Sequence, residues 1–197
     1  MTRARRGATP FALLTLTAVL LTGCGDDSDS ERLSRSQASS TSSSGDDNAS
    51  AEKQALFRVH QLIDGRNAIR QAPGTYRDAS SIGFADDGMA KTIIAESLEL
   101  EDKDRKQEGK VVLSGEPTVH EVDLNPERQG EAAVNPYVDV RACVDASQSH
   151  LVDAKGKKVA KSEGDGPRMM QFHVINRHWP SNSGWRVAWE KDLKKPC

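Results

Sequence analysis

Apolar positions along the chain change their period near residue 110, and this change predicts the order of the elements. From Ala51 to Pro73, apolar residues recur at spacings of three and four, as on a helix with one buried face. A second helix is expected to begin at Asp86-Asp87, where negative charge is favourable, and to continue into a charged segment that ends at Gly109.

After Gly109 the period is two, which predicts β-strands separated by turns. In the last strand, Trp185, Val187 and Trp189 are expected to share one face. The four expected strands cover 111–124 with an interruption near 115–117, 134–146, 169–179 preceded by a short extended piece at 150–153, and 185–190. Helices followed by antiparallel strands indicate an α+β domain, in which the helices pack on one face of a curved sheet of about four strands.

The residues before 51 have a different composition from the rest. A hydrophobic share of 36% is low for a chain that folds throughout. The deficit lies in 25–50, where Leu33 is the single large aliphatic residue among many Ser and Asp residues, so this segment is expected to be a flexible tether. The net charge of −2 provides no broad basic surface, which argues against nucleic acid as a partner.

The first 24 residues form a basic start, an apolar run from Phe11 to Leu21, and the sequence Leu21-Thr22-Gly23-Cys24. The run is shorter than the roughly 20 residues of a spanning helix, so a processed signal peptide is predicted. Leu21 to Cys24 resembles the lipobox of bacterial lipoprotein precursors. The resemblance implies cleavage before Cys24 and a diacylglycerol on its sulfur, which anchors the mature chain to the extracytoplasmic face of the cell membrane. The expected parts are therefore a signal peptide at 1–23, the lipidated cysteine and tether at 24–50, and a folded domain at 51–197.

Several features of the folded part carry a second resemblance. They are the helix that ends before Gly109-Lys110, Gly115-Glu116-Pro117, the strand 137–145, the turn 152–156, and the closing 184–187 with the terminal Pro196-Cys197. With these features the domain resembles the cone-shaped nuclear-transport-factor-2-like (NTF2-like) domains, as found in small exported lipoproteins of actinobacteria. The resemblance implies a pocket between the helices and the sheet.

Two cysteines remain after Cys24, namely Cys143 within a strand and Cys197 at the end of the chain. Because thiols oxidise outside the cytoplasm, a Cys143–Cys197 disulfide is predicted. The alternative is a metal site or a catalytic thiol, but no histidine has ligand spacing with either cysteine. No metal or other cofactor is predicted.

Seven residues are candidates for lining the pocket that the resemblance implies. They are Tyr76, Tyr137, Asp139, Arg141, His173, Trp185 and Trp189. Asp139, Asp145 and His173 are residue types that serve as general acids or bases, but no spacing forces them together. The chain has no recognisable Ser-His-Asp set and no phosphate-binding glycine loop, so no catalytic residue is assigned.

The sequence therefore favours a non-catalytic binding or scaffold module over an enzyme. Its expected partner is another envelope protein, peptidoglycan or a small apolar ligand. One alternative is an enzyme of the isomerase or dehydratase type, because some relatives of this shape use an Asp or His within the pocket. Another is an accessory component of a secretion or conjugation apparatus, since related folds serve in such assemblies.

Overall fold

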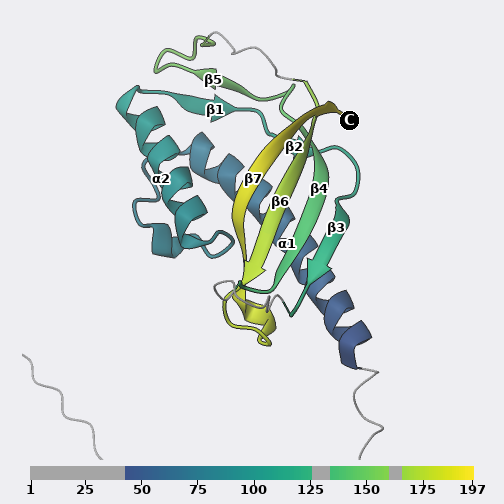
Figure 1. The fold of residues 1–197 in the computed structure, drawn as a ribbon. Coiled ribbons are helices and arrows are strands. Elements are labelled where there is room, and N and C mark those ends of the chain that lie inside the picture. Colours follow the sequence, from purple (N-terminus) through teal and green to yellow (C-terminus); the bar gives the residue numbers. More distant parts are fainter. Residues whose placement is uncertain (1–42, 126–133, 160–165) are drawn as a thin grey trace, which may run out of the picture. The chain divides into compact units, whose positions relative to one another are not determined.

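Two α-helices precede an antiparallel sheet in a computed structural model that describes residues 43–125, 134–159 and 166–197 (Figure 1). The expected signal peptide, Cys24 and most of the tether lie outside the described residues. The elements are α1 (Ser43–Gln71), η1 (Ala79–Ser81), α2 (Asp87–Asp102), β1 (Lys106–Glu108), β2 (Val112–Leu113), β3 (Thr118–Asp123), β4 (Tyr137–Asp145), β5 (His150–Val152), β6 (Arg168–Asn176), η2 (Asn182–Gly184) and β7 (Trp185–Pro196). The α+β class expected from the sequence is confirmed.

The described strands form a larger and a smaller sheet. The larger has the order β2-β4-β6-β7, with β3 also paired to β4, and all its pairings are antiparallel. The smaller consists of β1 and β5. The structure has more strands than the expected number of about four. Strands such as β1 and β5 have only three residues, which is too short to display a period of two. The interruption expected near Gly115 separates β2 from β3.

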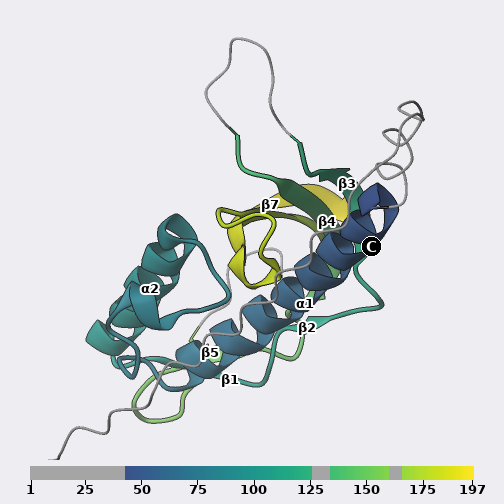
Figure 2. The same cartoon turned by 90° about the horizontal axis from the view of Figure 1, so that it is seen from below.

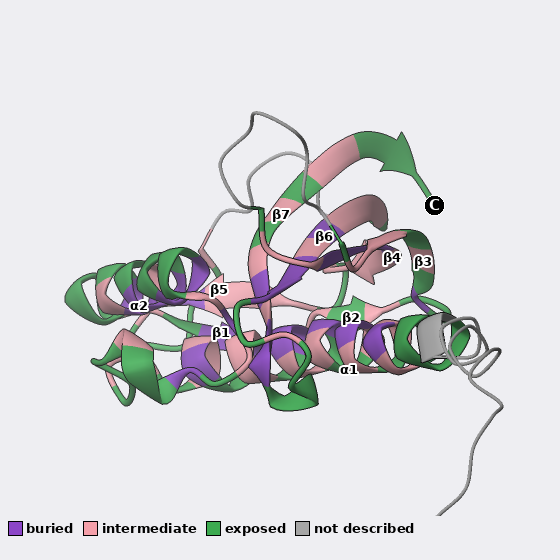
Figure 3. Cartoon of the chain, turned by 60° about the horizontal axis from the view of Figure 1, so that its bottom comes forward, coloured by how far each residue is buried: buried purple, intermediate pink, exposed green. Residues whose placement is uncertain are grey.

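Helix α1 lies along one face of the larger sheet (Figure 2). Its buried residues Ala55, Val59, Leu62 and Ile69 pack with inward-facing residues of the sheet such as Phe172. Figure 3 shows that burial is concentrated on the sides that face each other. In the described part of the chain, no helix covers the opposite face, which we call the outer face of the sheet.

Helix α1 begins at Ser43, eight residues before the expected start at Ala51. Residues 45–49 are exposed. They carry no apolar stripe, so the periodicity of buried residues gives no sign that the helix extends through them.

Helix α2 begins at Asp87, as expected, with Asp86 as its N-cap residue. The Asp86 carboxylate does not cap the helix. Instead it accepts hydrogen bonds from Nε and Nη2 of Arg177, at 2.8 and 2.9 Å, which lowers the pKa of Asp86. The bond joins the start of α2 to the end of β6.

The prediction that Gly109 ends the second helix is wrong. Helix α2 ends at Asp102, and residues 106–108 form β1. Gly109 follows this strand with φ +73°, and a Cβ there would collide with the carbonyl oxygen of Gln148. The residue is needed for a close backbone approach rather than for a helix cap.

A disulfide joins Cys143 to Cys197, with a Cα–Cα distance of 5.7 Å, and confirms the predicted pairing. It links the C-terminal residue to β4, although β6 lies between β4 and β7 in the sheet. In the described part of the chain, no helix has the length and apolar character to cross a membrane.

Candidate functional site

A β-bulge in β7 determines which tryptophan is available on the outer face. His173 pairs with Trp189 and Val174 pairs with Val187, so Ala188 is an additional residue that shifts the register. Trp185 and Val187 therefore point into the core, whereas Trp189 lies on the outer face and is 41% exposed. The expectation that all three share one face is wrong, because a strict period of two does not continue through a bulge.

Four residues from four neighbouring strands form a row across the outer face. The register pairs Glu121 of β3 with Asp139 of β4, Asp139 with His173 of β6, and His173 with Trp189 of β7. Residues directly opposite each other on antiparallel strands have side chains close enough to interact. The sheet therefore brings together residues that are far apart in the sequence.

Asp139 and His173 form the central pair of this row. Nδ1 of His173 lies 2.7 Å from Oδ1 of Asp139, and Nε2 of Gln171 donates to Oδ2 at 2.8 Å. Asp139 is only 8% exposed, so both oxygens of a buried carboxylate have partners. Because the carboxylate holds Nδ1, the imidazole has one fixed orientation.

Aromatic rings extend the row on both sides of His173. The imidazole stacks on Trp189 with a centroid distance of 4.8 Å, and its centroid lies 4.9 Å from that of Tyr137. The Tyr137 hydroxyl donates to Oε1 of Glu121 at 2.7 Å, and this bond raises the pKa of Tyr137 to about 12. We call Glu121, Tyr137, Asp139, Gln171, His173 and Trp189 the outer-face cluster.

The other candidate residues lie elsewhere or have other partners. Arg141, two residues along β4 from Asp139, has an Nη2 atom 2.8 Å from Nε2 of His120. Trp185 is fully buried and makes an edge contact with Trp179. Tyr76 lies between α1 and η1 and is 37% exposed. The structure thus brings four of the seven candidates together, with Arg141 nearby.

A cavity of about 140 Å³ lies between α1 and the inner side of the sheet, and we call it the α1 cavity. None of the seven candidates lines it. Its polar lining residues are Arg66, Asn67, Arg70, Gln107 and Glu190. The sequence contains a sign of this cavity, because Arg66, Asn67 and Arg70 continue the stripe of Val59, Leu62 and Ile63 at positions where apolar residues are expected.

Two pairs organise the polar groups of the α1 cavity. Nη1 of Arg66 lies 2.6 Å from Oε1 of Glu190, which connects α1 to β7. Asn67 accepts from Nε2 of the buried Gln107 at 2.7 Å, and its own amide donates to the carbonyl of Val111. These bonds fix one end of the cavity.

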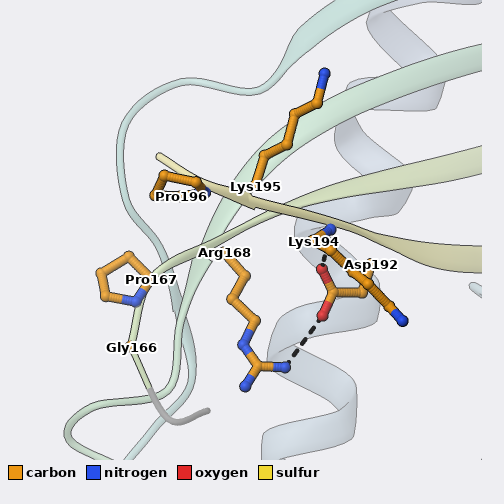
Figure 4. A pocket seen from close by; sticks show the side chains of 7 residues that line it. All are labelled: Gly166, Pro167, Arg168, Asp192, Lys194, Lys195 and Pro196. Carbon is orange, nitrogen blue, oxygen red and sulfur yellow. Dashed lines mark hydrogen bonds and ion pairs between the residues drawn. The ribbon is translucent and has the colours of Figure 1, made fainter.

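A more open depression lies at the C-terminal end of β7 (Figure 4). Arg168 donates to Asp192 at 3.0 Å, and the same carboxylate accepts from the backbone N–H of Lys194. Lys195 and Pro196 complete this edge. The depression therefore has a basic border, but its carboxylate is already occupied by partners of its own chain.

The outer-face cluster has one feature of a catalytic site, because a buried carboxylate that orients an imidazole is typical of a general base. Within the cluster, however, Tyr137 and Asp139 are buried, whereas Trp189 is exposed. His173 does not line the α1 cavity, and Trp189 and Tyr137 pack against its ring. Among the described residues, no group of three or more His, Cys, Asp or Glu side chains has the geometry to hold a metal ion.

No protein-family model matches the chain, and no curated protein matches it. Among solved structures, the chain is similar to the intermembrane space region of the chloroplast protein ARC6, with a TM-score of 0.48 and 14% sequence identity, covering 72% of this chain and 95% of that one.

Proposed function

We propose that this chain is a lipid-anchored, extracytoplasmic protein whose domain binds another envelope protein through the outer-face cluster without catalysing a reaction. The observation that carries the proposal is the arrangement of Trp189, which is exposed on an uncovered sheet face and held in place by the His173 ring. Rigid, partly exposed Trp and Tyr side chains are enriched at the centres of protein interfaces.

The hydrogen bonds of the cluster support recognition rather than turnover. The Asp139 carboxylate accepts from Gln171 and lies against Nδ1 of His173, so both side chains are held in fixed positions within the cluster. The Tyr137 hydroxyl is likewise engaged by Glu121. Groups fixed in this way lose little conformational entropy when a partner binds, which favours affinity.

Two features of the sequence support the proposed location. The lipobox-like Leu21 to Cys24 would attach diacylglycerol at Cys24, and the Ser-rich segment after it would hold the domain at some distance from the membrane. Two acyl chains give stable attachment, whereas one detaches readily. We also propose that the domain is a cone of the NTF2-like type, supported by helices on one face of an antiparallel sheet and a cavity between them.

One observation favours the enzyme alternative, namely the 2.7 Å contact between His173 and Asp139. An isomerase or dehydratase would need this pair to reach a substrate held on the outer face. Its activity would disappear in Asp139→Asn, whereas the binding module would retain its partner. The other alternative, an accessory of a secretion or conjugation apparatus, also requires binding. The partner would then be a component of that assembly.

A site-specific crosslinking experiment tests the proposal. A photoreactive residue at Lys191, which pairs with Gln171 of the cluster, should crosslink the full-length chain in intact cells to a discrete envelope protein. The control position is Phe57, an exposed aromatic residue of α1. A chain with the photoreactive residue at Phe57 should give no crosslinked product. The product formed at Lys191 should disappear when the same chain also carries Trp189→Ala. A product that survives Trp189→Ala, or that forms equally at Phe57, would reject the outer-face cluster as the binding surface.

The location is tested separately by Cys24→Ser. The native chain should partition with membranes and incorporate acyl label, whereas the variant should lose both properties. Unchanged membrane attachment of the variant would refute the lipid anchor without affecting the binding surface.

A further inference from the structure

We propose that the α1 cavity is a binding site for a small organic acid that carries a carboxylate on a compact apolar group. This site is distinct from the outer-face cluster and does not depend on the function proposed for it. The cavity combines a cationic end with an apolar floor. The cationic end favours a carboxylate, and the apolar floor limits the size and polarity of the rest of the ligand.

The cationic end is formed by Arg70. Its Nε is buried and has no hydrogen-bonding partner, and the residue forms no ion pair within 4 Å among the described residues. Burial lowers the pKa of this guanidinium, yet an arginine keeps its charge at neutral pH. The guanidinium as a whole is half-buried, and an anionic ligand that supplies an acceptor to its buried Nε is stabilised.

The neighbouring carboxylates make their direct ion pairs with Arg66 rather than with Arg70. Glu190 is engaged with Arg66 at 2.6 Å, and Glu96 lies 3.8 Å from Nε of Arg66. Both carboxylates act on Arg70 only at longer range. Among the described residues Arg70 therefore has no direct ion-pair partner, and its guanidinium is available to a ligand carboxylate.

The apolar floor limits the other end of the ligand. It includes Ile63, Val144, Met170 and the fully buried Phe172. The volume of about 140 Å³ is close to that of an engineered apolar cavity of about 150 Å³ that binds benzene. A single aromatic ring or a short branched chain fits this space, whereas a long acyl chain does not.

A pair of isosteric ligands tests the carboxylate directly. Benzoate should bind the full-length chain with a Kd of about 0.1 to 1 mM, as measured by calorimetry, because a ligand of this size has few atoms with which to gain affinity. Benzamide has nearly the same shape without the charge and should bind at least tenfold more weakly. Equal affinity for the two ligands, or no binding of benzoate, would overturn the proposal.

Variants then locate the site. Arg70→Gln should weaken benzoate binding at least tenfold, whereas Arg58→Gln should leave it unchanged, because Arg58 lies on the same helix but donates to Gln61 and does not line the cavity. Trp189→Ala should also leave the Kd unchanged, which separates this site from the outer-face cluster. Loss of benzoate binding in Trp189→Ala, or its retention in Arg70→Gln, would place the ligand elsewhere. If Arg70→Gln does not fold, Arg70→Lys replaces it, with the expected result of weakened but charge-selective binding.

Discussion

Replacing Cys143 and Cys197 together with alanine should lower the free energy of unfolding of the domain by about 4 kcal/mol. The two cysteines are 54 residues apart, and the bridge closes a loop that contains β5, β6 and β7. For a loop of this length, the chain-entropy relation gives a loss of about 14 cal/mol/K in the unfolded chain, or about 4 kcal/mol at 25 °C. This is a large share of the 5–15 kcal/mol that typically stabilises a domain.

Urea unfolding of the oxidised chain, followed by the fluorescence of the buried Trp185, measures this difference. With a slope of about 2 kcal/mol/M, the midpoint should fall by about 2 M in the double variant. The reduced native chain is the control and should unfold with the double variant, since both lack the same loop. A loss below about 1 kcal/mol would refute the reasoning, because it would mean that the unfolded chain gains little freedom when the bridge is absent.

Two further predictions concern a backbone position and a titrating group. Gly109→Ala should lower the free energy of unfolding by more than about 3 kcal/mol, because the added Cβ meets the carbonyl oxygen of Gln148. Gly115 also has a positive φ but lies in open space, so Gly115→Ala should lower it by about 1 kcal/mol. Equal losses of stability in thermal unfolding of the two variants would contradict this reasoning. Tyr137, whose pKa is raised to about 12, stabilises the folded state below the unfolded-state pKa of 10, and this contribution is lost between pH 10 and pH 12. Glu121→Gln should lower the pKa of Tyr137 in a spectrophotometric phenol titration, and an unchanged titration curve would contradict the assigned cause.

Part of the fold could be predicted from recognisable sequence patterns. The alternation around Val138 and Val140 predicts β4, and both of these side chains are fully buried. The oxidising compartment inferred from the signal sequence led to the pairing of Cys143 with Cys197. Both predictions depend on local periodicity or on a small number of possible partners.

The composition of the outer-face cluster could not be predicted in the same way. Which face Trp189 occupies depends on the additional residue Ala188, and a bulge leaves no mark on the hydrophobic pattern around it. The pairing of Asp139 with His173 depends on the register between β4 and β6, which is set by the whole sheet. Neither residue carries a sequence signal that specifies its partner.

The α1 cavity was missed for a different reason. Arg66 and Arg70 are spaced by four and lie on the side of α1 that faces the sheet, where apolar residues are expected. An arginine at a core-facing position is unusual, because charged side chains are rarely buried unless they are paired. The two arginines on the apolar stripe of α1 were therefore the sequence signal that could have indicated the cavity.

The proposed binding function is tested most directly by the affinity of the domain for the envelope protein that crosslinks at Lys191. Trp189→Ala should weaken this affinity by more than about 30-fold, the effect of losing a central interface residue of about 2 kcal/mol, while Phe57→Ala stays within about twofold of the native chain. Asp139→Asn should retain most of the affinity. If Trp189→Ala binds as tightly as Phe57→Ala, the outer face of the sheet is not the surface that this protein uses.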